Sequence, residues 1–218
     1  MEREYRQHVY RPPAGAMDLL LIRHGESAPA RPDRPFPVAD GRGDPDLHPM
    51  GEVQARAVAE RLRAEPIAAI YVTALRRTQQ TAAPLAAHLR LTPAIEADLS
   101  EVFLGDWDRG LYRIRAAENH PAFLRATERR EWGELPGAET TAALHARVRS
   151  ALLRMAGRHP DQRIAAFVHG GVIGAALALA CGGDAFAFNG AANGSISRLV
   201  IRGSDMVVRG FNDCAHLD

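Results

Sequence analysis

Lysine is absent from this chain of 218 residues, so all 27 of its strongly basic side chains are arginines. The phosphate-binding loop of many nucleotide kinases ends in Lys-Ser or Lys-Thr, and the absence of such a motif excludes that class. The acidic residues number 26, and the resulting net charge of +1 argues against a protein that coats nucleic acid. Because arginine is so common in this chain, an arginine is evidence for a functional site only where its position in the sequence also points to one.

Cysteine and long apolar segments are scarce as well. The two cysteines, Cys181 and Cys214, form neither a disulfide framework nor a metal-binding motif. No apolar run is long enough to span a bilayer, and residues 1–16 are polar and show no secretory pattern. We therefore expect a soluble, cytoplasmic protein that has no membrane partner.

Apolar residues nevertheless make up 46 % of the chain, which is enough for the core of one α/β domain. Short aliphatic runs at residues 18–22, 69–72 and 164–168 predict buried strands. Helical patterns separate these runs, and the alternation indicates a three-layer α/β/α sandwich with a mainly parallel central sheet. We expect residues 1–16 to form an N-terminal extension and residues 17–218 to form a single domain.

Three local features complete this prediction. Residues 28–46 contain five prolines and two glycines and are expected to form a loop. Residues 75–89 have a helical pattern, which Pro84 is expected to kink or break and which Thr73 is expected to cap. Residues 109–131 are expected to be helical.

Candidate functional residues first appear where the strand at 18–22 ends. Arg23, His24 and Gly25 follow it directly, and ligands of open α/β sheets bind at the ends of buried strands. The planar guanidinium of arginine matches the oxygens of a phosphate, and an imidazole can attack phosphorus or pass a proton. The sequence therefore predicts a site for a phosphate group at this strand end.

Two other strand ends carry similar residues. Arg77 lies in the first turns of the helix that follows the strand at 69–72. His169 follows the strand at 164–168, and Gly170 opens a helix whose free N–H groups attract an anion. A single histidine after an apolar run is more often structural, but two histidine–glycine pairs after two strands favour one shared functional site.

Together these segments resemble the signature motifs of the histidine phosphatase superfamily, the phosphoglycerate-mutase-like proteins. The resemblance runs from about Asp18 to Val208, with the motifs in the family's order. The Thr73–Ala82 segment aligns with a motif in which serine or threonine is followed four positions later by the pocket arginine. This alignment selects Arg77 rather than Arg76, and His169 corresponds to the family's second histidine, a phosphate ligand.

The segment Leu99–Trp107 resembles the acid loop of the family, in which a glutamate precedes an aromatic residue, a glycine and a second aromatic residue. Cleavage of a phosphate ester needs a proton for the leaving oxygen, and a positioned carboxylic acid can supply it. The resemblance makes Glu101 this acid, and Asp106 and Asp108 are its local competitors.

Two further segments resemble the family without carrying chemistry. Leu47–Ala55 is similar to the opening of a family helix, and we interpret Pro136–Thr140, with Arg147 beyond it, as a capped helix. The chain also departs from the family pattern at Ala30, where members often carry an asparagine that contacts phosphate. The predicted phosphate site is therefore one donor short. We assign no catalytic role to Asn193.

The resemblance implies a phosphatase that works through a phosphohistidine and needs neither a metal nor a cofactor. His24 would attack the phosphorus, and Glu101 would protonate the leaving group. The catalytic residues implied are Arg23, His24, Arg77, Glu101 and His169. The substrate-binding residues implied are Arg23, Ser27, Arg77, His169 and Gly170.

Two alternatives stay open at this point. A phosphoglycerate mutase would return the phosphoryl group to its substrate, although residues 102–107 look more like the phosphatase branch. A non-catalytic phosphate-binding protein of the same fold is the second, although all five catalytic positions hold competent residues. The expected partner is a small-molecule phosphate ester and not nucleic acid. The oligomeric state is left open, with a homodimer among the possibilities.

The identity of the substrate lies beyond the sequence, which does not separate a sugar phosphate from a nucleotide or a phosphoprotein. Residues 28–46 and 109–132 are expected to form the walls of the pocket. Their arginines suggest a substrate with further negative charge, and they are Arg31, Arg34, Arg42, Arg113 and Arg115.

Overall fold

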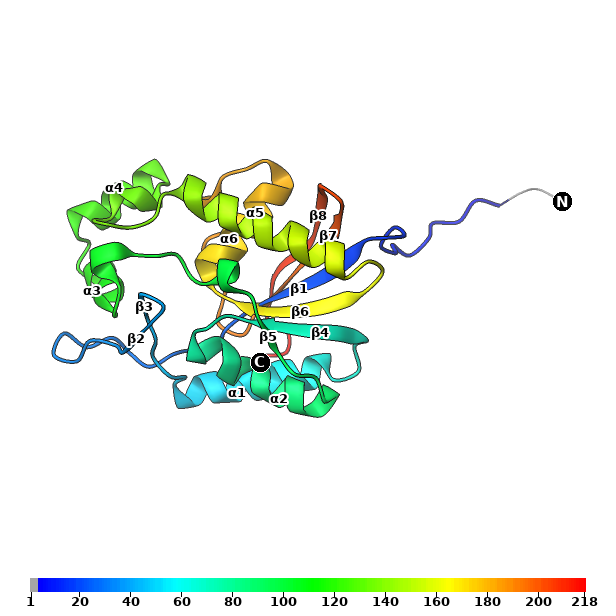
Figure 1. Cartoon of the computed structure of the whole chain (residues 1–218), viewed down its shortest axis with the longest axis horizontal. Helices are drawn as coiled ribbons and strands as arrows, with labels where there is room; N and C mark the ends of the chain where they lie inside the picture. The colour runs from blue at the N-terminus through cyan, green and yellow to red at the C-terminus, as the bar shows by residue number, and fades with distance from the viewer. Residues whose placement is uncertain (1–3) are drawn as a thin grey trace.

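The computed structural model describes residues 4–218, and its centre is a six-stranded β-sheet (Figure 1). In sheet order the strands are β5 (Ala94–Ile95), β4 (Ile67–Val72), β6 (Arg163–Val168), β1 (Met17–Arg23), β7 (Ile196–Arg202) and β8 (Asp205–Asp213). Neighbours from β5 to β1 pair in parallel, whereas β7 and β8 are antiparallel additions. The sheet is mainly parallel, as predicted.

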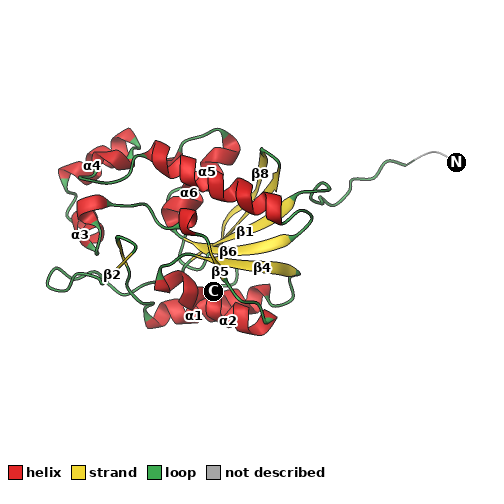
Figure 2. Ribbon diagram, viewed as in Figure 1, coloured by secondary structure: helices red, strands yellow, loops and turns green. Residues whose placement is uncertain are grey.

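Helices cover both faces of this sheet (Figure 2). The helices α1 (Pro49–Leu62) and α2 (Arg76–Leu89) pack on one face, and α5 (Thr141–Arg158) and α6 (Gly170–Cys181) pack on the other. In the part of the chain that the structure describes, none of the helices combines the length and the apolarity of a membrane span.

Strand β1 explains why both layers of helices are needed. Successive side chains of a strand point to opposite faces, and the stretch from Leu19 to Ile22 in β1 places buried aliphatic side chains on both. Leu19 and Leu21 belong to the core under α5 and α6, while Leu20 and Ile22 belong to the core formed with α1 and α2. Each face must therefore be covered, and the predicted three-layer α/β/α sandwich is confirmed.

The shorter elements gather beyond the end at which the parallel strands finish (Figure 1). Within the predicted loop at residues 28–46, β2 (Val38–Ala39) and β3 (Arg42–Gly43) form a small hairpin. The loop is joined to the next segment because the Phe36 N–H donates to the Arg109 carbonyl oxygen at 3.0 Å. The remaining elements are η1 (Ala97–Leu99), η2 (Gly105–Trp107), α3 (Leu111–Ala117), α4 (Pro121–Arg129), η3 (Trp132–Glu134) and η4 (Ala185–Phe188).

The segment at residues 109–131 forms two helices, α3 and α4, instead of one continuous helical stretch. Asn119 adopts a left-handed backbone conformation with φ of 52°, which ends the first helix. His120 precedes a proline, and the residue before a proline disfavours helical backbone. The prediction missed this boundary because the charge pattern continues across it.

The helix α2 also differs from its prediction. It continues unbroken through Pro84, so the helix tolerates the loss of the one backbone hydrogen bond that proline cannot donate. Its capping position is Leu75, which has no side-chain cap, and Thr73 reaches only the Leu75 N–H, at 3.3 Å. The Thr73 hydroxyl bonds instead to the side chains of Thr78 and His169.

Candidate active site

A cavity of about 240 Å³ lies at the end of the sheet where β1 and β4 finish. Residues from both predicted walls contribute to it, together with the loop that carries Glu101. The charged and histidine side chains that line it are Arg23, His24, Arg42, Arg77, Glu101, Asp108, Arg109 and Arg113. The aromatic side chains that line it are Phe36, Trp107, Tyr112 and Trp132. The cavity lining therefore combines an excess of positive charge with aromatic side chains.

His24 follows β1 with its ring held in one orientation. Its Nδ1 donates to the Gly25 carbonyl oxygen at 2.7 Å, so Nε2 carries the lone pair and accepts from Arg77 Nε at 3.2 Å. Burial, followed by the positive charges of Arg77 and Arg23, lowers the pKa of His24 well below its usual 6.5. The ring is therefore neutral at neutral pH, and its Nε2 can act as a nucleophile.

Arg23 and Arg77 bring positive charge to the same cavity. Arg77 is buried and donates to the Gly43 carbonyl oxygen at 2.9 Å, and Arg23 donates to the Ala191 carbonyl oxygen. Burial lowers the pKa of Arg77 to about 10 and also lowers that of Arg23, and Glu101 offsets part of both effects. In the described part of the chain, neither guanidinium forms an ion pair. Buried charges in proteins are normally paired, so this arrangement calls for an anionic ligand.

His169 follows β6 and lies beside His24. The two ring centroids are 5.2 Å apart in an edge-on arrangement, and His169 Nε2 lies 3.1 Å from the Thr73 hydroxyl. Burial, followed by the charge of Arg77, lowers the pKa of His169 well below its usual value. The ring is fully buried and, among the described residues, is not part of the cavity lining. Direct contact of His169 with phosphate stays a prediction.

Two other predicted substrate-binding residues also lie outside the cavity lining, as far as residues 4–218 show. Ser27 is buried, and its hydroxyl accepts from Arg113 at 2.7 Å. Gly170 packs against Arg23, since a Cβ atom there would lie 3.5 Å from Arg23 Nε. The binding roles of both residues stay predictions. Of the arginines expected to face the substrate, the described lining includes Arg42 and Arg113.

Glu101 lies on the cavity wall, in the loop between η1 and η2. Its carboxylate accepts from the Val102 N–H at 3.0 Å, and its backbone carbonyl accepts from Arg42 at 2.7 Å and from Arg147 at 3.1 Å. A Cβ atom at Gly171 would lie 2.9 Å from Glu101 Oε1. A glycine in the first turn of α6 therefore lets the acid loop approach this closely.

The two competing carboxylates are placed less favourably. Asp108 lines the cavity, but its oxygens accept from the backbone N–H groups of Gly43 at 3.1 Å and Leu104 at 2.8 Å. Asp106 is exposed and is not part of the described lining. The geometry therefore favours Glu101 as the acid. Across residues 4–218, no group of three or more His, Cys, Asp or Glu side chains is arranged to hold a metal ion.

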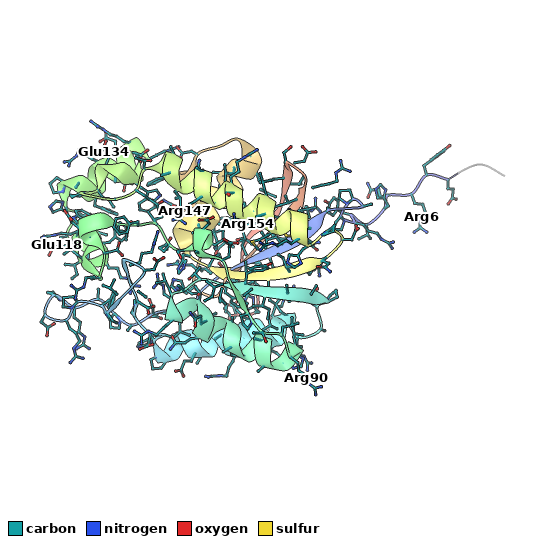
Figure 3. The ribbon with its side chains drawn as sticks, viewed as in Figure 1. Arg6, Arg90, Glu118, Glu134, Arg147 and Arg154 are labelled. Carbon is teal, nitrogen blue, oxygen red and sulfur yellow. The ribbon has the colours of Figure 1, made fainter. Side chains whose placement is uncertain are left out.

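Two residues support the site although the sequence analysis gave them no role in it. Arg147 projects from α5 toward the acid loop (Figure 3), where it pairs with Glu139 at 2.6 Å and donates to the Ser100 carbonyl oxygen at 2.7 Å. The interpretation of this stretch as a capped helix is therefore incomplete. Asn193 donates to the His24 carbonyl oxygen at 2.9 Å. The sequence around Arg147 and Asn193 does not indicate which loops their side chains will contact.

The lowered pKa values of His24 and His169 can be checked by NMR titration of the histidine rings. Both rings should stay neutral at pH 6.5, where an unperturbed histidine is half protonated, because protonation adds charge to a buried cationic site. Each should gain its proton only as the pH falls well below 6.5. His24→Asn and His169→Asn variants would assign the signals. A midpoint at or above 6.5 for either ring would contradict the geometry.

The fold and the cavity define an α/β protein with arginines and a neutral histidine at the end of its sheet. Residues 19–214 match the family model of the histidine phosphatase superfamily (branch 1), and the chain belongs to this family. The resemblance found in the motifs is thereby confirmed.

Individual relatives agree with this assignment. The metal-independent phosphoserine phosphatase of Arabidopsis thaliana is 30 % identical over 204 residues, which cover 92 % of this chain and 83 % of that protein. Phosphoglycerate mutase-like protein 4 of the same plant is 32 % identical over 159 residues, which cover 72 % and 67 %. The solved structure of a mycobacterial glucosyl-3-phosphoglycerate phosphatase has a TM-score of 0.75 at 27 % identity, covering 90 % of this chain and 99 % of that one.

Proposed function

We propose that this protein is a phosphomonoester hydrolase that acts on a small phosphorylated substrate through a phosphohistidine, without a metal or a cofactor. One observation carries the proposal. The neutral His24 lines a cavity with its Nε2 lone pair beside Arg77 Nε, and among the described residues neither Arg23 nor Arg77 forms an ion pair with a carboxylate. Such a site attracts a phosphate dianion and offers phosphorus a nucleophile.

In the first half of the reaction, His24 Nε2 attacks phosphorus in line with the ester bond. The new N–P bond forms as the P–O bond breaks, and Arg23 and Arg77 neutralise charge on the phosphoryl oxygens. The Glu101 carboxyl group gives its proton to the leaving oxygen, so the product departs as an alcohol.

In the second half, water replaces the alcohol. The Glu101 carboxylate takes a proton from this water, and the resulting hydroxide attacks phosphorus while the N–P bond breaks. His24 regains its Nε2 lone pair, Glu101 regains its proton and inorganic phosphate leaves. Every group thus returns to its starting state, which a catalytic cycle requires.

Release of inorganic phosphate from an aryl phosphate in EDTA tests this function directly. Turnover under these conditions supports a metal-independent phosphatase and excludes a non-catalytic binding protein. No turnover of the aryl phosphate or of any member of a metabolite panel would contradict the proposal. The same panel would identify the preferred substrate, which the cavity alone leaves open.

Phosphoryl transfer of the mutase type is the second candidate, because the relatives include proteins named as phosphoglycerate mutase-like or as probable phosphoglycerate mutases. A mutase would keep the phosphohistidine from water and return the group to its substrate. Incubation with 3-phosphoglycerate separates the two, since a mutase forms 2-phosphoglycerate and a phosphatase releases inorganic phosphate. Dominant isomer formation would favour the mutase.

Arg77→Ala should lower the rate of phosphate ester hydrolysis by roughly 10²–10³, which is comparable with the loss of one hydrogen-bond donor from an oxyanion hole. The reason is that Arg77 donates to His24 Nε2 and lines the cavity beside it. Its neighbour provides a matched control, because Arg76 pairs with Asp44 and Asp46, each at 2.9 Å, outside the described lining. Arg76→Ala should stay within about tenfold of wild type. The reverse ranking in steady-state kinetics would show that the wrong arginine had been assigned.

A further inference from the structure

Arg113 takes no part in the proposed mechanism, yet α3 delivers it to the cavity wall. Its Nη2 donates to the Ser27 hydroxyl at 2.7 Å, and its Nη1 donates to the Ala28 carbonyl oxygen at 3.0 Å. The guanidinium also lies over the Phe36 ring, 5.4 Å from its centroid. Although the residue as a whole is exposed, its charged end is therefore fixed in direction.

The guanidinium of Arg113 lacks a close carboxylate partner in the part of the chain that the structure describes. Within the described chain, Arg113 forms no ion pair, whereas Arg115 on the same helix pairs with Glu118 at 2.9 Å. A guanidinium carries five N–H donors, and the two hydrogen bonds of Arg113 leave three of them free. Glu101 and Glu26 raise the pKa of Arg113 from a distance, but neither forms an ion pair with it among the described residues. An anchored arginine with free donors on a cavity wall has the features of a binding group for an anion.

The charge of Arg113 also acts on the groups around His24. Arg23, Arg77 and Arg113 all line the cavity that contains His24, and Arg77 Nε lies 3.2 Å from His24 Nε2. Burial is the main cause that lowers the pKa of His24, Arg77 and Arg113. The charge of Arg113 adds to this effect on His24 and Arg77, while Glu101 raises the pKa of all three arginines. The three arginines therefore share one region of the cavity with the histidine nucleophile.

Small residues bring α3 close enough for this contact. A Cβ atom at Gly110, just before α3, would lie 3.1 Å from the Ala30 Cβ and 3.0 Å from the Phe36 ring. Larger residues at positions 30 and 110 would therefore push α3 away from the loop that follows His24. Arg113 reaches Ser27 across 86 positions of the chain because this packing is tight.

We propose that Arg113 is a third phosphoryl-binding arginine, supplied by α3 to the loop that follows His24. The proposal rests on the proposed function for the identity of the anion. Arg113 stays anchored on Ser27 and donates its free N–H groups to a peripheral oxygen of the phosphoryl group. The loop that follows His24 lacks a hydrogen-bond donor at Ala30. Arg113, from a distant part of the chain, supplies a donor in its place.

Binding of inorganic phosphate and of orthovanadate, measured by calorimetry, tests this assignment without requiring turnover. Arg113→Met keeps the aliphatic stem that packs near Phe36 but removes the charge, and it should weaken binding of both anions by about tenfold or more. Arg115→Gln removes the same charge from the same helix outside the described lining and should bind both anions like wild type. Equal weakening in the two variants would reduce the effect to general electrostatics and overturn the assignment.

A lysine variant separates anion binding from mere bracing of the loop. Lysine is a point charge without the planar fork, so Arg113→Lys cannot reproduce the paired contacts to Ser27 and Ala28. It should nevertheless recover most of the anion affinity that Arg113→Met loses. A lysine variant as weak as the methionine variant would show that Arg113 only positions the loop.

The substrate panel provides the remaining distinction. If Arg113 binds the phosphoryl group, Arg113→Met should lower kcat/KM by a similar factor for esters with and without a second anionic group. A loss confined to doubly anionic substrates, with unchanged phosphate and vanadate binding, would place Arg113 at the leaving group and overturn the proposal. If wild type binds both anions but hydrolyses no ester, the proposed function fails while the anion-binding role of Arg113 is still tested.

Discussion

His24→Ala should lower kcat by at least about three orders of magnitude, as the loss of a nucleophile does. The variant removes the Nε2 lone pair that the Gly25 hydrogen bond and the surrounding cations keep available. Wild-type enzyme quenched during turnover should carry acid-labile, base-stable phosphate, and the variant should carry none. Rapid quenching followed by pH-dependent hydrolysis of the protein-bound phosphate measures this.

An exposed histidine on α2 is the matched control for this experiment. His88 lies near the end of that helix, outside the described cavity lining, so His88→Ala should retain wild-type turnover and phosphate labelling. Near-normal turnover by the His24 variant would exclude the covalent mechanism. Labelled phosphate that persists in it would place the acceptor on another residue.

Glu101→Gln should slow phosphorylation of His24 by roughly 10²–10⁴ for alkyl phosphates, the usual contribution of a general acid. The amide has the size of the carboxyl group and can still accept from the Val102 N–H, but it has no proton to give. The leaving group of an activated aryl phosphate departs without that proton. The variant should therefore lose much less of its phosphorylation rate with this substrate. Single-turnover kinetics on both substrates measures the difference.

Asp106→Asn provides the control for the acid, because Asp106 is on the same loop but exposed. It should remain within about tenfold of wild type on both substrates. Asp108 is less suitable, since its carboxylate holds the Gly43 and Leu104 backbone N–H groups and its removal would disturb the cavity wall. Equal losses for alkyl and aryl phosphates in Glu101→Gln would show that Glu101 is not the general acid.

The centre of the sheet could be predicted because β1, β4 and β6 are buried along most of their length on both faces. Such strands are continuous aliphatic runs, as at residues 164–168, and these stand out from amphipathic helices by composition and length. The residues Arg23, His24 and Arg77 could be found because each comes shortly after such a run. Strand ends of a parallel sheet share one edge, so sequence position translates directly into spatial proximity.

Contacts between distant segments could not be predicted in the same way. Arg147 reaches the Ser100 carbonyl oxygen across 47 positions, and Arg113 reaches Ser27 across 86. Both contacts depend on how α3 and α5 pack. The residues next to Arg147 and Arg113 in the sequence do not indicate which distant residue each arginine will contact. The boundary at Asn119, where φ is 52°, was missed for a different reason, since the charge pattern of the segment continues across it.

Within residues 4–218, neither Arg23 nor Arg77 forms an ion pair with a carboxylate, and this has a consequence for the protein between reaction cycles. Desolvated like charges oppose folding, so the empty enzyme is less stable than its packing alone would make it. An anion that binds only the folded state relieves this repulsion, and its contribution grows with its concentration relative to its dissociation constant. The melting temperature should consequently follow the supply of phosphate. The arginines of the cavity would thereby link the stability of the folded protein to the concentration of its anionic ligand.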